Sequence, residues 1–116
     1  GVENRLCQAM PYNANPYEHP WVSSHWKTFS LNLFYDISIK NFLDNQNLFF
    51  RRCYDHALML PMLYYANKNK LKSIHLNEFA YYYDNKRSSI LPNEMSGGAI
   101  EASIANFIRK RGFINK

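Results

Sequence analysis

Asp55 is the residue of this chain whose type and setting could do chemistry. It is the one carboxylate in residues 54–66, a stretch that is otherwise almost entirely apolar. The pattern is typical of a buried helix, and Asp55 would lie in its first turn, where free backbone N–H groups and the helix dipole stabilise negative charge. There it either caps the helix, which local sequence alone favours, or serves as a general base whose pKa the apolar setting moves toward neutrality.

The chemistry open to Asp55 depends on whether its helix is buried in the protein or spans a membrane. The apolar run is shorter than the roughly 20 residues that a bilayer-spanning helix needs, so we predict a buried core helix. Pro61 lies inside the run and removes one backbone hydrogen bond. Apolar residues on both sides of Pro61 favour one kinked helix over residues 54–66. The alternative is a helix that begins near Pro61.

Two further groups could contact a ligand. His25 lies in residues 21–29, which read as an extended segment, and it is either a hydrogen-bonded histidine of a half-buried strand or a contact at the edge of a pocket. The aromatic residues 81–83 are followed by Asn85 and Arg87, which could meet a sugar or a phosphate. The plainer interpretation of that segment is an amphipathic strand followed by a solvated loop.

Several kinds of site are excluded or disfavoured by spacing. The four glycines form no phosphate-binding loop, and the four histidines show neither an HExxH motif nor the spacing of a zinc site. Ser24, His25 and Asp55 could be combined into a hydrolase triad, but neighbouring residues on a strand point to opposite faces. A hydrolase is therefore not expected.

The remaining elements are predicted from periodicity and turn residues. Residues 31–37 read as a short helix capped by Ser30, with Leu31, Phe34 and Tyr35 on its buried face. Residues 11–20 contain three prolines and read as a surface loop, and residues 44–47 as a turn. Two short strands are expected at 72–76 and 79–83, and a final helix at 96–111.

Composition indicates one globular domain. The chain has 116 residues, of which 47% are hydrophobic, 20% charged and an unusually high 16% aromatic. Its net charge of +5 comes from short, scattered clusters. Such clusters are usually solvated faces, and attraction to phosphate-bearing ligands or an acidic membrane surface is the sharper alternative.

The two cysteines and the N-terminal residues bear on localisation. Cys7 and Cys53 form no metal or redox motif, which favours a reduced, cytoplasmic protein and leaves a single disulfide between them open. The first residues lack the apolar core of a signal peptide. Because the chain starts at Gly1, we expect a piece of something longer.

Two sequence blocks resemble a known family. Residues 19–29, HPWVSSHWKTF, and residues 54–63, YDHALMLPML, are followed by IHL at 74–76 and YYYDN at 81–85. Together they resemble the C-terminal half of family 2 glycosyltransferases of the GT-A type, over about residues 19–85. The final helix is not part of the resemblance.

The resemblance implies an α/β fold, a small mixed sheet with two or three helices packed on it. It places Asp55 at the acidic residue of the family's "ED" motif, the general base toward the acceptor hydroxyl, although Tyr54 stands where the family often has Glu. It implies that Ser24 and His25 line the sugar and diphosphate. Asn85 and Arg87 follow the strand at which some relatives bring a metal or phosphate ligand.

A DxD motif, which in this family holds a nucleotide-sugar through a divalent metal (Mn or Mg), does not occur in the chain. The resemblance therefore implies a partner, an N-terminal donor-binding half that brings the metal, while this chain supplies the acceptor side of a cytoplasmic transferase. Two rivals remain open. One is a non-catalytic basic aromatic module that binds nucleic acid, which we consider the less expected partner, and the other is a domain that binds a protein.

Overall fold

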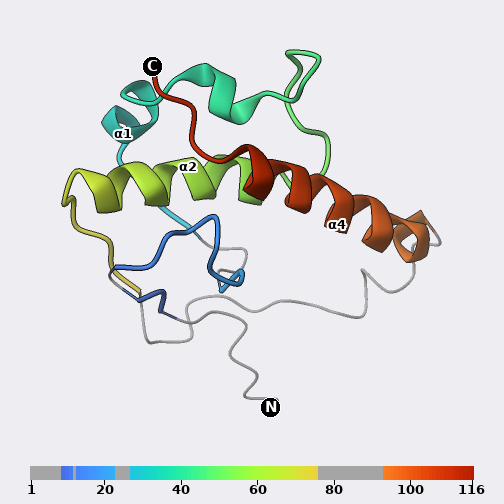
Figure 1. Ribbon diagram of the computed structural model, residues 1–116, viewed down its shortest axis with the longest axis horizontal. Coiled ribbons are helices and arrows are strands. Elements are labelled where there is room, and N and C mark those ends of the chain that lie inside the picture. Colours follow the sequence, from blue (N-terminus) through green and yellow to red (C-terminus); the bar gives the residue numbers. More distant parts are fainter. Residues whose placement is uncertain (1–8, 12, 23–26, 76–92) are drawn as a thin grey trace.

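The structure is a computed structural model that describes residues 9–11, 13–22, 27–75 and 93–116, with side chains of the last helix from residue 98 onward. Within these residues the chain forms helix α1 (Leu31–Tyr35), the 3-10 helix η1 (Ile39–Phe42), helix α2 (Tyr54–Lys68) and helix α4 (Asn93–Arg111). Figure 1 shows α2 at the centre, with α1 and η1 along one side and α4 crossing near its N-terminal end.

The predicted α/β fold is wrong. The described residues are mostly helical and contain no sheet, and their one β-type contact is an isolated antiparallel bridge between Leu43 and Phe49. Residues 72–75, predicted as part of a strand, have no regular structure, and Ile74 is 67% exposed. An extended segment is stable only where a neighbour completes its hydrogen bonds, and no described segment pairs with it. Residues 23–26 and the predicted strand 79–83 lie outside the described residues.

Helix α2 forms the core, as the apolar run predicts. Pro61 lies inside a single helix that runs from Tyr54 to Lys68, which confirms the prediction of one helix. The helix is buried on two sides, because one set of residues packs with the N-terminal loop and α4, and the other packs with the end of α1 and η1. The first cluster contains Tyr17, Ala57, Leu60 and Ile108, and the second contains Ile37, Phe42, Met59 and Met62.

Helix α1 is shorter and more exposed than predicted. It ends at Tyr35. Ser30 is the N-cap residue, as predicted, but its side chain makes no capping hydrogen bond. Leu31 and Tyr35 are 61% and 63% exposed, so they do not form the predicted buried face. A helix of five residues has little more than one turn, and its sequence pattern cannot fix which side packs. Phe34 alone stacks inward, on Phe42 with ring centroids 4.8 Å apart.

Residues 11–20 were predicted as a surface loop, but this segment contributes to the core. Tyr17 is 6% exposed, with its ring edge-on to Tyr64 at a centroid distance of 5.8 Å. Arg109 of α4 donates from Nη1 to the backbone oxygens of Tyr17, at 3.1 Å, and His19, at 2.6 Å. These bonds join residues about 90 positions apart and hold the loop against the helices.

The chain after α4 returns across η1. Gly112 ends α4 with a φ of +69°, a conformation that glycine adopts without steric cost. Asn41, 1% exposed, then donates to the backbone oxygen of Ile114 at 2.8 Å and accepts from its N–H at 2.8 Å. Arg111 donates to the backbone oxygens of Asn41 and Leu43. The C-terminal residues are therefore an integral part of the fold.

Candidate functional site

Asp55 lies in the first turn of α2, where the sequence places it. The residue before the helix, Cys53, has a left-handed backbone (φ 56°, ψ 29°) and makes no side-chain capping bond. The N–H groups of a first helical turn have no partner within the helix, and Asp55 Oδ1 accepts one of them, from His56, at 3.1 Å. Asp55 therefore performs part of the capping role that local sequence favoured.

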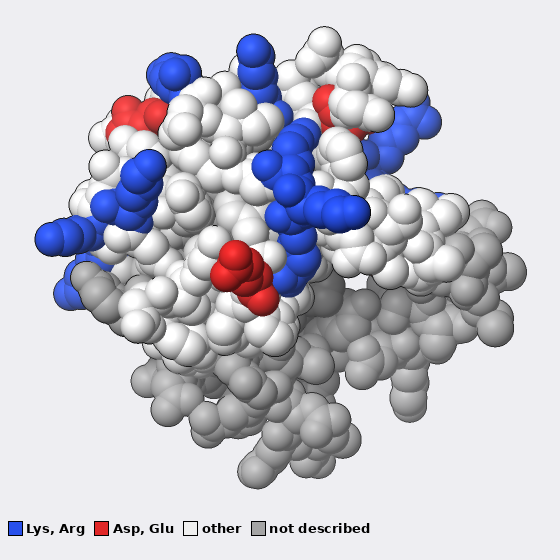
Figure 2. Space-filling model, viewed as in Figure 1, with Lys and Arg blue, Asp and Glu red and all other residues white. Residues whose placement is uncertain are grey.

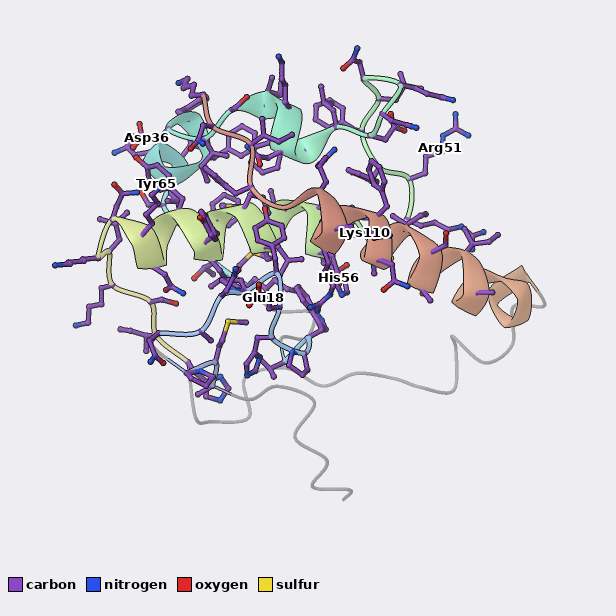
Figure 3. The ribbon with its side chains drawn as sticks, viewed as in Figure 1. Glu18, Asp36, Arg51, His56, Tyr65 and Lys110 are labelled. Atoms are coloured by element: carbon purple, nitrogen blue, oxygen red, sulfur yellow. The ribbon has the colours of Figure 1, made fainter. Side chains whose placement is uncertain are left out.

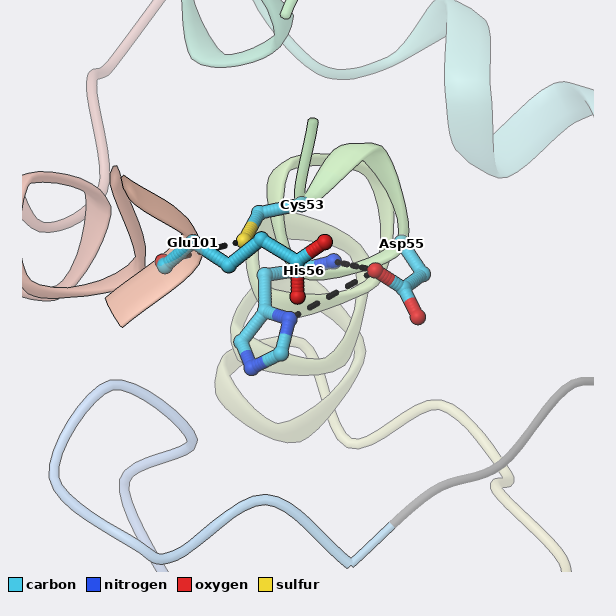
Figure 4. Close-up of polar contacts among 4 residues, drawn as sticks. All are labelled: Cys53, Asp55, His56 and Glu101. Carbon is cyan, nitrogen blue, oxygen red and sulfur yellow. Dashed lines mark hydrogen bonds and ion pairs between the residues drawn. The ribbon is translucent and has the colours of Figure 1, made fainter. Parts of the chain in front are cut away.

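The His56 side chain also lies close to the Asp55 carboxylate (Figure 4). Its Nδ1 lies 3.5 Å from Asp55 Oδ1, so that the backbone and the ring of His56 both face the same oxygen. The His56 side chain is only 17% exposed, and that of Asp55 is 39% exposed. Asp55 Oδ2 makes no hydrogen bond or ion pair with any residue that the structure describes. One carboxylate oxygen is thus held by His56.

An aromatic stack fixes the position of the His56 ring. Trp21 lies parallel to it, with ring centroids 3.9 Å apart and an interplanar angle of 21°. Lys27 Nζ lies 5.7 Å from the centroid of the same Trp21 ring, within the range of a cation–π contact. The N-terminal segment thus brings an aromatic ring and a cation to the head of α2. Figure 3 shows His56 at that end of the helix.

The surroundings lower the pKa of Asp55. The nearby His56 side chain, whose Nδ1 lies 3.5 Å from Asp55 Oδ1, is the largest cause, the charges of His56 and Lys27 act in the same direction, and partial burial opposes them. The sequence predicted the reverse direction, because it assigned Asp55 an apolar setting and could not show the donors. Asp55 is therefore ionised at neutral pH, as a carboxylate must be to accept a proton.

Cys53, next to this pair, has a thiol whose pKa is raised. It is a free cysteine whose Sγ donates to the backbone oxygen of Glu101 at 3.1 Å, which links the head of α2 to α4. Burial raises its pKa, and the charges of Glu101 and Asp55 raise it further. A nucleophilic cysteine requires the opposite shift. The other cysteine, Cys7, lies outside the described residues.

The structure places only one of the predicted site residues. Ser24, His25, Asn85 and Arg87 lie outside the described residues, as do Tyr81, Tyr82 and Tyr83. The sequence analysis did not assign Trp21 or Lys27 to the site. Their signal was present, because both belong to the block HPWVSSHWKTF that carries the family resemblance. What sequence could not show is that this block meets the head of α2.

The described carboxylates do not form a metal centre. No group of three or more histidine, cysteine, aspartate or glutamate side chains suited to a metal ion occurs within residues 9–11, 13–22, 27–75 and 93–116. The resemblance assigns the expected metal to a donor-binding half, and the described residues of this chain offer no such group of ligands.

Two shallow hollows stand out elsewhere on the described surface. One, of about 320 Å³, lies at the C-terminal end of α2, between Asn13, Tyr64 and Lys68. The other, of about 280 Å³, lies between Phe50 and Phe107. Asp55 lines neither of them, so the described residues alone do not enclose a substrate around it.

Comparisons with known proteins assign no family. No protein-family model, curated protein or solved structure matches this chain. In the described residues, no helix is long and apolar enough to cross a membrane. The resemblance to family 2 glycosyltransferases therefore remains a prediction that rests on the residues quoted above.

Proposed function

We propose that this chain forms the acceptor side of a glycosyltransferase and that Asp55 is its general base. Two independent features support the proposal. One is the sequence resemblance, which places Asp55 at the acidic residue of the family's motif. The other is that Asp55, at the head of the buried helix α2, is ionised, with Oδ1 held by His56 and Oδ2 unbonded among the described residues. This second observation carries the proposal.

The proposed step is an in-line displacement at the anomeric carbon of a nucleotide-sugar. The acceptor oxygen forms the new C–O bond, and its proton passes to Asp55. The bond between the anomeric carbon and the nucleoside diphosphate breaks, and the diphosphate leaves with the bonding electron pair. Attack from the face opposite the leaving group inverts the configuration at this carbon.

The lowered pKa of Asp55 is compatible with this role. A hydroxyl group becomes strongly acidic only as its oxygen bonds to the anomeric carbon, so proton transfer late in the step does not need a strong base. A carboxylate that stays ionised over the neutral pH range can accept a proton whenever an acceptor binds. His56 keeps Oδ1 in place, which reduces the reorganisation that the carboxylate needs when the acceptor binds.

The remaining parts of the proposal follow the resemblance. Ser24 and His25 would line the sugar and diphosphate, and Asn85 and Arg87 would contact phosphate. The donor-binding half would hold the nucleotide-sugar together with a Mn or Mg ion. Asp55, His56 and Trp21 would form the wall that the acceptor meets.

The test is Asp55→Asn in the intact protein, assayed by release of nucleoside diphosphate over a panel of nucleotide-sugars. Amide replacement removes the proton acceptor and keeps the size, so kcat should fall by about 10²-fold or more while donor binding persists. Asp36→Asn is the matched control, because Asp36 is an exposed residue at the end of α1. That variant should retain full activity.

Three results would contradict the proposal. Unchanged turnover with a lower melting temperature would limit Asp55 to stabilising the helix end. Absence of diphosphate release with every donor would argue against transfer altogether. Binding of single-stranded nucleic acid that weakens steeply with salt, with no response to nucleotide-sugars, would favour the basic aromatic module.

A further inference from the structure

Large apolar side chains are exposed on the loop that precedes α2. The loop spans residues 44–52, and we call it the tip loop. Within this loop, the side chains of Leu48 and Phe49 are 56% and 63% exposed. Exposed apolar residues that adjoin one another commonly mark a binding surface. The tip loop is therefore a candidate docking element.

The tip loop has a defined conformation. Asp44 Oδ1 accepts hydrogen bonds from the backbone N–H of Gln46 at 2.8 Å and of Leu48 at 3.0 Å, and the Asp44 N–H donates to the oxygen of Leu48 at 2.7 Å. Asn47 completes the turn with a φ of 63°. The turn thus has residues 45–47 at its outer end, and it fixes Leu48 and Phe49 at its base, where Phe49 forms a bridge with Leu43. Asp44, the one acid of the tip loop, has an oxygen committed to these bonds.

The apolar surface continues from the tip loop onto α4. The hollow of about 280 Å³ described above lies between them, lined by Phe50, Ile104 and Phe107 together with Asp44 and Asn45. On α4, Ile100 is 49% exposed and Phe107 is 37% exposed. The loop and α4 therefore each carry exposed apolar groups, and Phe50, Ile104 and Phe107 line the hollow between the two elements.

Cations accompany this apolar surface. Arg51 and Arg52 directly follow Phe50, and within the described part of the chain neither makes a hydrogen bond or an ion pair. Figure 3 shows Arg51 extending outward at the edge of the molecule, and Figure 2 shows lysine and arginine side chains over this view with only isolated acidic ones between them. Along the sequence, the apolar residues 48–50 are directly followed by the two cations, Arg51 and Arg52.

We propose that the tip loop and the adjoining side of α4 dock on an anionic phospholipid surface. Leu48 and Phe49 enter the headgroup region, while Arg51 and Arg52 remain at the level of the phosphates. Interfacial protein segments have this arrangement, since burial of apolar groups and attraction to anionic lipid add together. The charge complementarity between the two arginines and anionic lipid selects this occupant over an uncharged apolar partner.

The experiment is co-sedimentation of the 116-residue chain with phosphatidylcholine vesicles that contain, or lack, about one third phosphatidylserine. The chain should bind the anionic vesicles, and the binding should weaken as salt rises from about 0.1 M to about 0.5 M. Replacing both Leu48 and Phe49 by Ser should reduce the partition coefficient about tenfold or more. Arg51→Gln and Arg52→Gln should each reduce it about fivefold, and only with anionic vesicles.

Matched controls lie beyond the other end of α2. Ile74→Ser removes an apolar side chain that is 67% exposed, and Lys72→Gln removes an exposed cation, and neither should change vesicle binding. Far-ultraviolet circular dichroism establishes that each variant is folded. Phe49→Trp should shift the tryptophan emission to the blue when anionic vesicles are added, whereas Ile74→Trp should not.

Several results would overturn the proposal. These are equal binding to vesicles with and without phosphatidylserine, vesicle binding that survives loss of Leu48 and Phe49, and loss of binding in the Ile74 and Lys72 controls to the same extent. Self-association that depends on Phe49, without vesicle binding, would assign the surface to a second copy of the chain. None of these results depends on sugar transfer, so the proposal fails or stands separately from the proposed function.

Discussion

Replacing Asn41 tests the structure at its most buried polar side chain. Asn41→Leu keeps a similar volume but removes the hydrogen bonds to the N–H and the oxygen of Ile114, at 2.8 Å each, and one to the oxygen of Ser38 at 3.0 Å. The Ser38 oxygen retains the backbone N–H of residue 41 as a partner. The N–H and the oxygen of Ile114 therefore lose their hydrogen-bond partners, and this loss should lower the free energy of unfolding by about 2–3 kcal/mol.

Asn41→Asp separates the two bonds to Ile114. An aspartate still accepts from the Ile114 N–H, but a carboxylate cannot donate to the Ile114 oxygen, whereas a protonated carboxyl group can. Burial and the facing carbonyl oxygens should raise its pKa in the folded chain above the unfolded value. Stability is then highest below the unfolded pKa and is lost as pH rises toward the folded pKa. Asn41→Asp should approach the wild type at low pH only.

Urea unfolding followed by circular dichroism measures both effects, at about pH 4 and at about pH 7.5. For a chain of this size, Asn41→Leu should lower the melting temperature by roughly 10 °C. Asn45→Asp is the control for added charge, because Asn45 is exposed in the tip loop. A change below about 0.5 kcal/mol for Asn41→Leu would refute the assigned attachment of the C-terminal residues. The same pH dependence of stability in Asn41→Asp and Asn45→Asp would also refute it.

Two further predictions concern α2. Leu60→Ala should cost about 2–5 kcal/mol in urea unfolding, because Leu60 is fully buried in α2, whereas Leu48→Ala at a 56% exposed position should change stability by less than about 0.5 kcal/mol. The lowered pKa of Asp55 stabilises the folded chain above the unfolded pKa, and this contribution is lost as pH falls through the folded pKa. Asp55→Asn should remove this loss of stability at acid pH. The loss should be below about 1 kcal/mol, because the Asp55 side chain is 39% exposed. Thermal melts between about pH 2 and pH 6 measure it.

The helices were the predictable part of the fold. The run at residues 54–66 has apolar residues on all sides, so it could only be buried, and the structure confirms α2 from Tyr54 to Lys68. The final helix is also confirmed, although it begins earlier, at Asn93, than the predicted residue 96. Both depend on long, uninterrupted patterns, which local sequence determines well.

The strand predicted at residues 72–76 was wrong over the residues that the structure describes, because a strand depends on a neighbour. Residues 72–76 contain β-branched and apolar residues, which favour extended structure, but this preference has meaning only where a second segment completes the sheet. In the described residues the apolar groups are buried between helices, and Ile74 is left exposed. The position of Tyr17 could not be predicted either, because its backbone oxygen is held by a hydrogen bond from Arg109, which lies far along the chain.

The same reasoning explains which part of the candidate site sequence could give. Asp55 was identified because a lone carboxylate in an apolar run is conspicuous, and its position in the first turn follows from the helix itself. The direction of its pKa shift does not, because the pKa depends on the His56 ring, and Trp21, more than 30 residues earlier, stacks on that ring at 3.9 Å. Tertiary contacts thus contribute to the lowered pKa of the proposed base. A transplanted α2 peptide would keep the helix-start position of Asp55 but lose the aromatic stack that holds its partner.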